Sequence, residues 1–223
     1  AGFVGQVKEA FGSVDLLVNN AGITRDQLIL RMKEDDWDAV IATNLTATFT
    51  LTQAAMRPML KQRGGRIIVI SSVVGQMGNA GQANYAAAKM GIVGLSRVVA
   101  MEGVRNNVRS NVIAPFAWTR MIESIPVKDE AGAQRVGRMK AAMRADQVAQ
   151  LAVALCSDRA KNVSSQIFCV RGNEIILFDQ PRPIRSMADL SGWNPQKILD
   201  TCLPAMAPDF FGLEASADVF PYD

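Results

Sequence analysis

The chain of 223 residues contains no histidine, and this absence removes several chemistries at once. A Ser-His-Asp hydrolase, a Cys-His protease and a histidine-ligated metal site are all excluded. Only three cysteines are present (Cys156, Cys169 and Cys202), and no two of them have the C-x-x-C spacing. The sequence therefore predicts no metal site and no disulfide framework, and so few cysteines are typical of a reducing compartment.

Long hydrophobic runs and strong charge bias are also missing. The apolar runs are too short to span a membrane and no signal peptide is visible, so we predict a soluble, cytoplasmic protein with no membrane partner. Lys and Arg number 24 against 21 Asp and Glu, without a basic block, so nucleic acid is not an expected partner. The 49% of hydrophobic residues indicates a folded globular chain.

Short apolar runs alternate with helical patterns up to about residue 178. Strands are predicted at residues 15–18, 66–70, 111–114, 166–170 and 174–178, with Pro115 expected to stop the third. Helices are predicted at 35–63, 82–101 and 147–157, with a helix–loop–helix over 118–145 and a Gly-rich loop between Ser72 and Gly81. This alternation predicts an α/β fold with a doubly wound, Rossmann-like parallel sheet. Such sheets bind ligands outside the carboxyl ends of their strands.

The composition changes after residue 178, because six of the nine prolines lie between Pro181 and Pro221. We therefore divide the chain into a domain over residues 1–178 and a Pro-rich C-terminal extension over residues 179–223. Four aromatic residues of the extension are too apolar to remain in water: Trp193, Phe210, Phe211 and Phe220. We expect the extension to pack on the domain or on a neighbouring subunit.

Tyr85 and Lys89 are four residues apart in a predicted helix, so their side chains share one face. A phenol titrates near 10, too high for an efficient base at neutral pH, and a nearby ammonium favours the phenolate. We therefore expect Lys89 to lower the pKa of Tyr85. Ser72 lies at a predicted strand end, where its hydroxyl would meet a substrate carbonyl. Asn44 lies within a predicted helix, where an amide is not preferred, and its side chain or carbonyl is expected to hold a water behind Lys89.

These residues occur in the order and spacing of a known family. The motif NNAG at 19–22, followed by Asn44, Ser72, Tyr85 and Lys89, resembles the short-chain dehydrogenase/reductases. The stretches NNAGITRDQLILR (19–31) and GQMGNAGQANYAAAK (75–89) look most like the 3-oxoacyl-[acyl-carrier-protein] reductase branch. The resemblance covers about residues 1 to 170. It implies hydride transfer between NAD or NADP and a ketone or secondary alcohol.

The resemblance also implies a role for each residue. Tyr85 would exchange the proton with the substrate oxygen, Ser72 would orient that oxygen, and Lys89 would bind the nicotinamide ribose. The residues expected to contact the cofactor are Asn20, Ala21, Gly22, Tyr85, Lys89, Pro115 and Thr119. Asn19 is expected to tie strands together. Because the family assembles through the helix of Tyr85 and its neighbour, we expect a homotetramer or homodimer.

The chain departs from the family pattern at both ends and after its third strand. The family opens with a strand, a G-x-x-x-G-x-G turn and a helix, whereas only eighteen residues precede Asn19. A βαβ unit needs about 30 residues, so we expect an N-terminally incomplete domain that binds a dinucleotide poorly. The usual Pro-Gly reads Pro115-Phe116 here, which would bring Trp118 to the substrate mouth. The usual V-N/D-G-G ending is replaced at 170–173.

We predict an NAD(P)-dependent oxidoreductase that acts on a small molecule or an acyl thioester. A 3-oxoacyl thioester reductase and a 3-hydroxyacyl-CoA dehydrogenase both fit. Two alternatives stay open: a dehydrogenase of steroid-like or other secondary alcohols, and a non-catalytic, truncated family member that acts in assembly or regulation. The residue that reads the adenosine ribose is not found in the chain, so the choice between NAD and NADP stays open.

Overall fold

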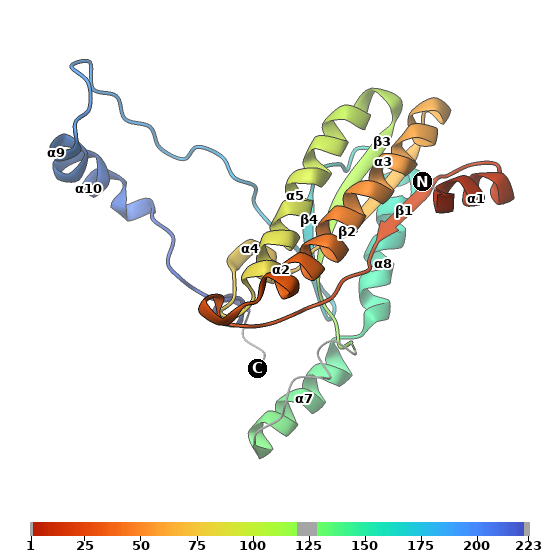
Figure 1. The fold of residues 1–223 in the computed structure, drawn as a ribbon, viewed down its shortest axis with the longest axis horizontal. Coiled ribbons are helices and arrows are strands. Elements are labelled where there is room, and N and C mark those ends of the chain that lie inside the picture. Colours follow the sequence, from red (N-terminus) through yellow and green to blue (C-terminus); the bar gives the residue numbers. More distant parts are fainter. Residues whose placement is uncertain (1, 120–128, 221–223) are drawn as a thin grey trace. The chain divides into compact units, whose positions relative to one another are not determined.

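The computed structural model describes residues 2–119 and 129–220, which form a five-stranded sheet with helices on both faces (Figure 1). The strands are β1 (Leu16–Asn19), β2 (Gly65–Ile70), β3 (Val108–Phe116), β4 (Ile167–Arg171) and β5 (Glu174–Leu177), in that spatial order. The first four strands are parallel, and β5 pairs antiparallel with β4. This arrangement confirms the predicted α/β class.

One helix precedes the first strand and the others connect the parallel strands. They are α1 (Gly2–Phe11), α2 (Glu34–Ile41), α3 (Ala47–Gln62), α4 (Val73–Met77), α5 (Ala83–Gly103), α7 (Glu130–Ala142) and α8 (Ala145–Cys156). Short 3-10 turns occupy Ile29–Arg31, Val104–Asn106 and Asp158–Ala160. A π-helical turn, η2 (Ala42–Thr46), joins α2 to α3, so the stretch predicted as one helix is continuous but changes its pitch in the middle. The first part of the predicted helix–loop–helix falls on residues 120–128, outside the described residues.

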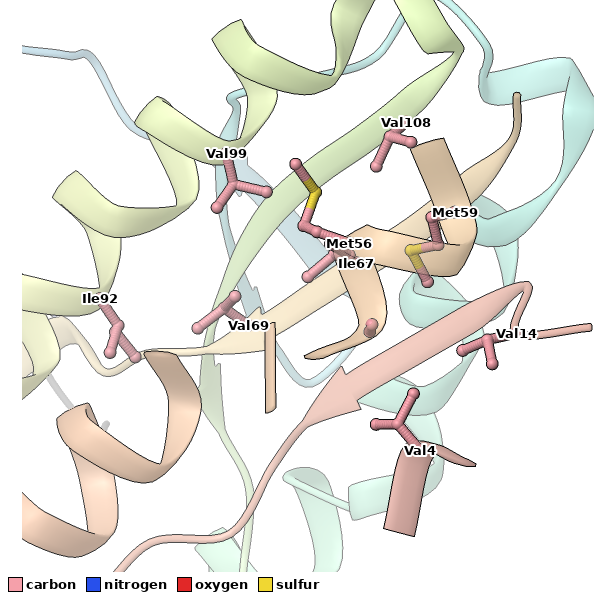
Figure 2. Close-up of a cluster of buried hydrophobic side chains, with 10 residues drawn as sticks. Val4, Val14, Met56, Met59, Ile67, Val69, Ile92, Val99 and Val108 are labelled. Atoms are coloured by element: carbon pink, nitrogen blue, oxygen red, sulfur yellow. The ribbon is translucent and has the colours of Figure 1, made fainter. Parts of the chain in front are cut away.

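The alternating side chains of β2 hold the two layers of helices to the sheet, because successive residues of a strand point to opposite faces. Ile67 and Val69 pack with α1, α3 and α5 in one buried cluster, which Figure 2 shows from within. Ile68 belongs to a second cluster, with Leu151 and Leu155 of α8. Both faces of β2 are therefore buried, as its unbroken apolar sequence predicts.

The prediction that β3 stops at Pro115 is wrong, because the strand continues through Pro115 to Phe116. The pairing of β2 with β3 ends at Ile113, while β4 pairs with β3 as far as Phe116. Pro115 therefore lies where β3 has a neighbour on one side only. At such a position the missing N–H of proline need not interrupt the sheet.

The predicted loop between Ser72 and Gly81 also needs correction, since its first residues form helix α4. Ser72 has extended backbone angles and its Oγ accepts a hydrogen bond from the backbone N of Val74 at 3.2 Å. A serine that caps the first turn in this way stabilises even a short helix. α4 lies against α5, which brings Ser72 and the helix of Tyr85 together.

The chain after residue 178 divides into two parts, whereas a single extension over residues 179–223 was predicted. Residues 179–214 form a compact unit of their own, while residues 215–220 belong to the first unit together with the domain that ends at residue 178. In the first unit, α11 (Ser216–Val219) is followed by Phe220, which is buried with its ring centroid 5.2 Å from that of Phe116. Packing on the domain is thus observed for this last segment.

The unit of residues 179–214 is built from short helical turns. They are α9 (Pro195–Lys197), the π-turn η5 (Ile198–Cys202), α10 (Leu203–Met206) and a 3-10 turn at Ala207–Asp209. Ion pairs join Lys197 to Asp189 at 2.8 Å and Arg185 to Asp209 at 2.8 Å. Phe210 and Phe211 are exposed within this unit, and their packing on the domain or on a neighbouring subunit stays a prediction. In the described ranges, no helix is both long and apolar enough to cross a membrane.

The central position of Ile67 in the core gives a first test of the fold. Ile67 is fully buried, so Ile67→Ala should lower the free energy of unfolding by about 2–5 kcal/mol through lost burial and the cavity left behind. Val153→Ala on α8 is the matched control, because Val153 is 70% exposed and its truncation should change stability by less than about 0.5 kcal/mol. Denaturant unfolding of both variants measures the difference, and equal losses would contradict the packing of β2.

Candidate active site

Three parallel strands end at one edge of the sheet and deliver polar residues there. Asn19 ends β1, Ile70 ends β2, and β3 continues to Phe116. The residues that follow are 20–22 after β1, 71–72 after β2 and 117–119 after β3. Carboxyl ends of parallel strands form the crevice in which such sheets bind ligands. The predicted site residues therefore converge on the expected edge.

Ser72 and Tyr85 are brought together at this edge. Tyr85 lies in the first turn of α5, is 9% exposed, and its phenol is hydrogen-bonded to the side chain of Ser72. The Ser72 oxygen already accepts the backbone N–H of Val74, so its own proton is left to be donated. The geometry thus sets two hydroxyl groups side by side, each able to donate to one acceptor atom.

Lys89 lies one turn further along α5 with its ammonium buried. Its Nζ donates to the backbone oxygen of Ile70 at 2.7 Å and lies 5.6 Å from the ring centroid of Tyr85. At that distance the cation is attracted by the face of the ring. The predicted sharing of one helix face is therefore realised. The hydrogen bond to Ile70 also ties the ammonium to the end of β2.

The π-turn η2 directs Asn44 into the same region, where it is 1% exposed. Its Oδ1 accepts from the backbone N of Ile23 at 2.9 Å, and its Nδ2 donates to the backbone O of Ile23 at 2.9 Å. The side chain is thus fully engaged in holding the segment after β1. The backbone O of Asn44 accepts the hydroxyl of Thr48 at 2.9 Å and keeps a second lone pair, so the expected water would be held there.

Burial is the main influence on the pKa values of Tyr85 and Lys89. Burial lowers the pKa of Lys89 from 10.5 to about 8, because the interior disfavours its charge. Burial also raises the pKa of Tyr85 above its ordinary value, the hydrogen bond from Ser72 lowers it, and the negative charge of Asp26 raises it. The pKa of Tyr85 is thus raised overall, so the phenol keeps its proton at neutral pH, and the lowering of this pKa by Lys89 stays a prediction.

Gly22, one of the residues expected to contact a cofactor, lies close to Asn44 and Lys89. A Cβ on Gly22 would lie 3.3 Å from Oδ1 of Asn44 and 3.5 Å from Nζ of Lys89, so the backbone passes close by. Asn20 and Ala21 are exposed before it. Asn19 ties β1 to a helix rather than to another strand, since its Nδ2 donates to Thr52 Oγ1 on α3 at 3.0 Å.

The residues after β3 lie further along the same edge. Pro115 is half-buried, and Thr119 is exposed. Trp118, which was expected at the substrate mouth, is half-buried, and its backbone N donates to the backbone O of Met143 at 2.7 Å. The structure thus gives these residues an accessible position but no contact with Tyr85 or Lys89 among the interactions described.

Two residues that support Lys89 were not identified from the sequence. Ser71 is buried and its Oγ donates to the backbone O of Lys89 at 2.7 Å. Gly75 in α4 faces the same residue, and a Cβ there would lie 2.8 Å from both the carbonyl carbon and the Cβ of Lys89. The close approach of α4 to α5 therefore requires glycine. The signal available in the sequence was a glycine in the first turn after a capping serine.

The site shows no sign of a metal. Among residues 2–119 and 129–220, no three acidic or cysteine side chains are grouped so that they could hold a metal ion. Cys169 is buried, which raises the pKa of its thiol to about 11 and makes it unreactive. Burial also raises the pKa of the half-buried Cys156. The polar groups described at this edge are hydroxyls, amides, the ammonium of Lys89 and the nearby carboxylate of Asp26.

Comparisons with known proteins agree with this geometry. The family model described as short chain dehydrogenase matches residues 1–128. The 3-oxoacyl-[acyl-carrier-protein] reductase of Salmonella typhimurium is 46% identical over 170 residues, which cover 74% of this chain and 68% of the relative. That of Thermotoga maritima is 45% identical over 177 residues, covering 78% and 71%. A crystal structure of a short chain dehydrogenase from Mycobacterium avium superposes with a TM-score of 0.78 at 34% identity, covering 95% of this chain and 70% of that one.

The close approach at Gly75 can be tested by adding a single methyl group. Gly75→Ala should lower the free energy of unfolding by about 1–3 kcal/mol, because the new Cβ collides with the backbone of Lys89. Gly94→Ala on α5 is the control, since nothing lies within 4 Å of its Cβ position, and alanine there should stabilise the helix by about 0.5–1 kcal/mol. Thermal unfolding measures both changes. A Gly75→Ala variant as stable as Gly94→Ala would contradict the contact.

Proposed function

Because the chain belongs to the short-chain dehydrogenase family, we propose that this site reduces the ketone of a 3-oxoacyl thioester to a secondary alcohol. The family predicted from the sequence is confirmed, and with it the identification of the chain as an oxidoreductase. The matched relatives are named as reductases of a 3-oxoacyl group on an acyl carrier protein, which supports a thioester substrate for this chain.

The residues at the strand ends fit the nicotinamide end of a dinucleotide. The family uses NAD(P)H, and when it is bound, a reduced nicotinamide supplies the hydride that the ketone carbon accepts. Gly22 leaves room for a close approach within 3.5 Å of Lys89 Nζ, where a side chain would stand in the way. Lys89 would hold the ribose, while Asn20, Ala21, Pro115 and Thr119 would line the remaining contact surface. The choice between NAD and NADP is not part of the proposal.

Tyr85 and Ser72 would act together on the ketone oxygen. As the carbon gains a hydride, negative charge develops on that oxygen, and a proton must be delivered to it. Tyr85 carries its proton at neutral pH, since burial raises its pKa, so its Oη can act as the acid. Ser72 donates a second hydrogen bond that orients the oxygen and stabilises its charge. The product is a secondary alcohol, and Tyr85 is left as a phenolate.

Lys89 would stabilise that phenolate and help to restore its proton. Its ammonium lies 5.6 Å from the centre of the Tyr85 ring, and a pKa of about 8 lets it both carry and release a proton near neutral pH. Asn44 would continue the path through its backbone oxygen. The observation that carries the proposal is the convergence of a buried phenol, a hydroxyl and a buried ammonium at the edge where this fold binds ligands.

The same α5 helix supports a homo-oligomer. Its outer side exposes Met90, Val98 and Met101, which are 42%, 50% and 67% exposed. A row of apolar side chains on one helix face is typical of a surface that pairs with another subunit. We therefore propose a homotetramer or homodimer, formed through this helix. The free thiols of the chain also fit a protein of the cytoplasm.

Removing one oxygen atom tests the role of Tyr85. In the full-length protein, Tyr85→Phe should lower kcat for reduction of a 3-oxoacyl thioester by about 10²–10⁴-fold, because the proton donor is lost while the ring remains. NAD(P)H absorbance measures the rate. Tyr222→Phe, the same change at the only other tyrosine, is the control and should keep normal activity. Wild-type turnover in the Tyr85→Phe variant would end the proposal.

The pKa of Lys89 predicts the pH dependence of the reaction. Below about pH 8 the buried ammonium is charged, and above it the charge is lost, whereas the Tyr85 phenol stays protonated throughout this range because its pKa is raised. We therefore expect kcat for reduction to be constant at neutral pH and to fall above about pH 8. In Lys89→Met, kcat should be low and this fall should disappear. If kcat of Lys89→Met still falls above about pH 8, the fall is caused by the titration of another group.

A further inference from the structure

Asn84, the residue before Tyr85, has the most completely buried polar side chain in the first turn of α5. It is 0% exposed and makes three hydrogen bonds. Its Oδ1 accepts from the backbone N of Tyr85 at 2.7 Å, and its Nδ2 donates to the backbone oxygens of Arg25 at 3.0 Å and Asp36 at 3.2 Å. A single amide thus connects the backbone of Tyr85 to two other segments.

The start of α5 depends on this side chain, because its cap residue does not supply the usual hydrogen bond. Gln82, at the N-cap, makes no side-chain bond to the first turn. The first N–H groups of a helix have no partner within the helix and need one from elsewhere. The side chain of Asn84, from inside the helix, is the hydrogen-bond acceptor for the backbone N–H of Tyr85. It therefore fixes the backbone from which the phenol extends.

The two carbonyl groups that Asn84 holds belong to segments already tied to the site. Arg25 lies two residues after Ile23, which the side chain of Asn44 binds through both its N and its O. Asp36 lies in α2, the helix that leads into the π-turn carrying Asn44. Asn44 and Asn84 therefore bind the same stretch of chain, Asn44 at Ile23 and Asn84 at Arg25. Through it, the positions of Asn44, Gly22 and Tyr85 depend on one another.

Two more hydrogen bonds fasten this stretch to the residues before α5, and the second of them is exposed. The backbone N of Gln27 donates to the backbone O of Gly81 at 2.8 Å, and Nε2 of Gln82 donates to Oδ2 of Asp26 at 2.9 Å. Water competes with an exposed bond of this kind. The bond from Asn84 to the backbone N of Tyr85 is buried and its bonds to Arg25 and Asp36 are part-buried, so Asn84 is the better shielded attachment.

We propose that Asn84 is a positioning residue, which directs the Tyr85 hydroxyl toward Ser72 by joining the backbone N of Tyr85 to the backbone oxygens of Arg25 and Asp36. This rests on the proposed function of Tyr85 as the proton donor. An amide is required because one side chain must accept from one N–H and donate to two carbonyl groups at once. A carboxylate of the same shape cannot donate, and alanine does neither.

The first test compares Asn84→Ala with Asn111→Ala in the full-length protein. Asn111 is also buried, and its side chain likewise accepts one backbone N–H and donates to one carbonyl, but it lies on β3 away from the site. Asn84→Ala should lower kcat about tenfold or more with a smaller change in KM, since a small displacement of a reacting group is costly. Asn111→Ala should keep kcat within about twofold per folded molecule. Equal kcat values in the two variants would overturn the proposal.

A second measurement needs no turnover and separates this proposal from the proposed function. The chain has only two tyrosines, so in a Tyr222→Phe background the ultraviolet absorbance of the phenolate reports the pKa of Tyr85 alone. Ser72, Lys89 and Asp26 face this phenol, and the Ser72 bond lowers its pKa. Asn84→Ala should therefore raise the alkaline midpoint, while Asn111→Ala should not. An unchanged midpoint would refute the positioning role even in an active enzyme.

If wild-type protein reduces no 3-oxoacyl thioester but the midpoint still rises in Asn84→Ala, the proposed function fails and the positioning role stands. Should Asn84→Ala fail to fold, Asn84→Asp is the second variant, with Asn111→Asp as its partner. The aspartate keeps the shape and the acceptor for Tyr85 N but loses both donors when ionised. Its kcat should again fall about tenfold relative to Asn111→Asp. A kcat equal to that of Asn111→Asp would count against the role of the two carbonyl bonds.

Discussion

The burial of one ammonium group organises the site. A charge taken out of water must be compensated by nearby dipoles or opposite charge. At Lys89 the compensation comes from the carbonyl of Ile70, at 2.7 Å, and from the face of the Tyr85 ring. Both partners are fixed by the fold, one by the end of β2 and the other by the helix that carries Lys89 itself. No carboxylate lies among these partners, so the site keeps its positive charge for a ligand.

The surroundings of Lys89 allow this arrangement for two reasons. Two glycines leave space for the neighbouring backbone, and two asparagines hold the chain after β1 in place by hydrogen bonds. Gly22 lets the chain after β1 pass near Nζ, and Gly75 lets α4 lie against the backbone of Lys89. The buried side chains of Asn44 and Asn84 bind this stretch of chain through hydrogen bonds. Such bonds are strong in a region of low dielectric and costly to break. They therefore hold the segment after β1 beside α5.

Much of this was predictable from the sequence, for reasons that differ from residue to residue. The strands were found because buried parallel strands are apolar at every position, and Ser72, Tyr85 and Lys89 because their spacing follows strand and helix periodicity. Pro115 was misjudged, since whether a strand tolerates proline depends on where its neighbours end. The raised pKa of Tyr85 was not predicted, because it comes mainly from burial in three dimensions, which the local spacing of residues does not reveal.

The lowered pKa of Lys89 also means that burying this charged side chain reduces the stability of the folded protein. A shift from 10.5 to about 8 corresponds to about 3 kcal/mol against the charged form. Because the unfolded chain keeps this proton up to its ordinary pKa, the penalty is fully present below about pH 8 and is relieved as the pH rises toward 10.5. At neutral pH the protein therefore carries the whole penalty. An apolar side chain of similar length would avoid this penalty, so the stability of the fold does not explain a lysine at this position, whereas the proposed role of Lys89 beside Tyr85 does.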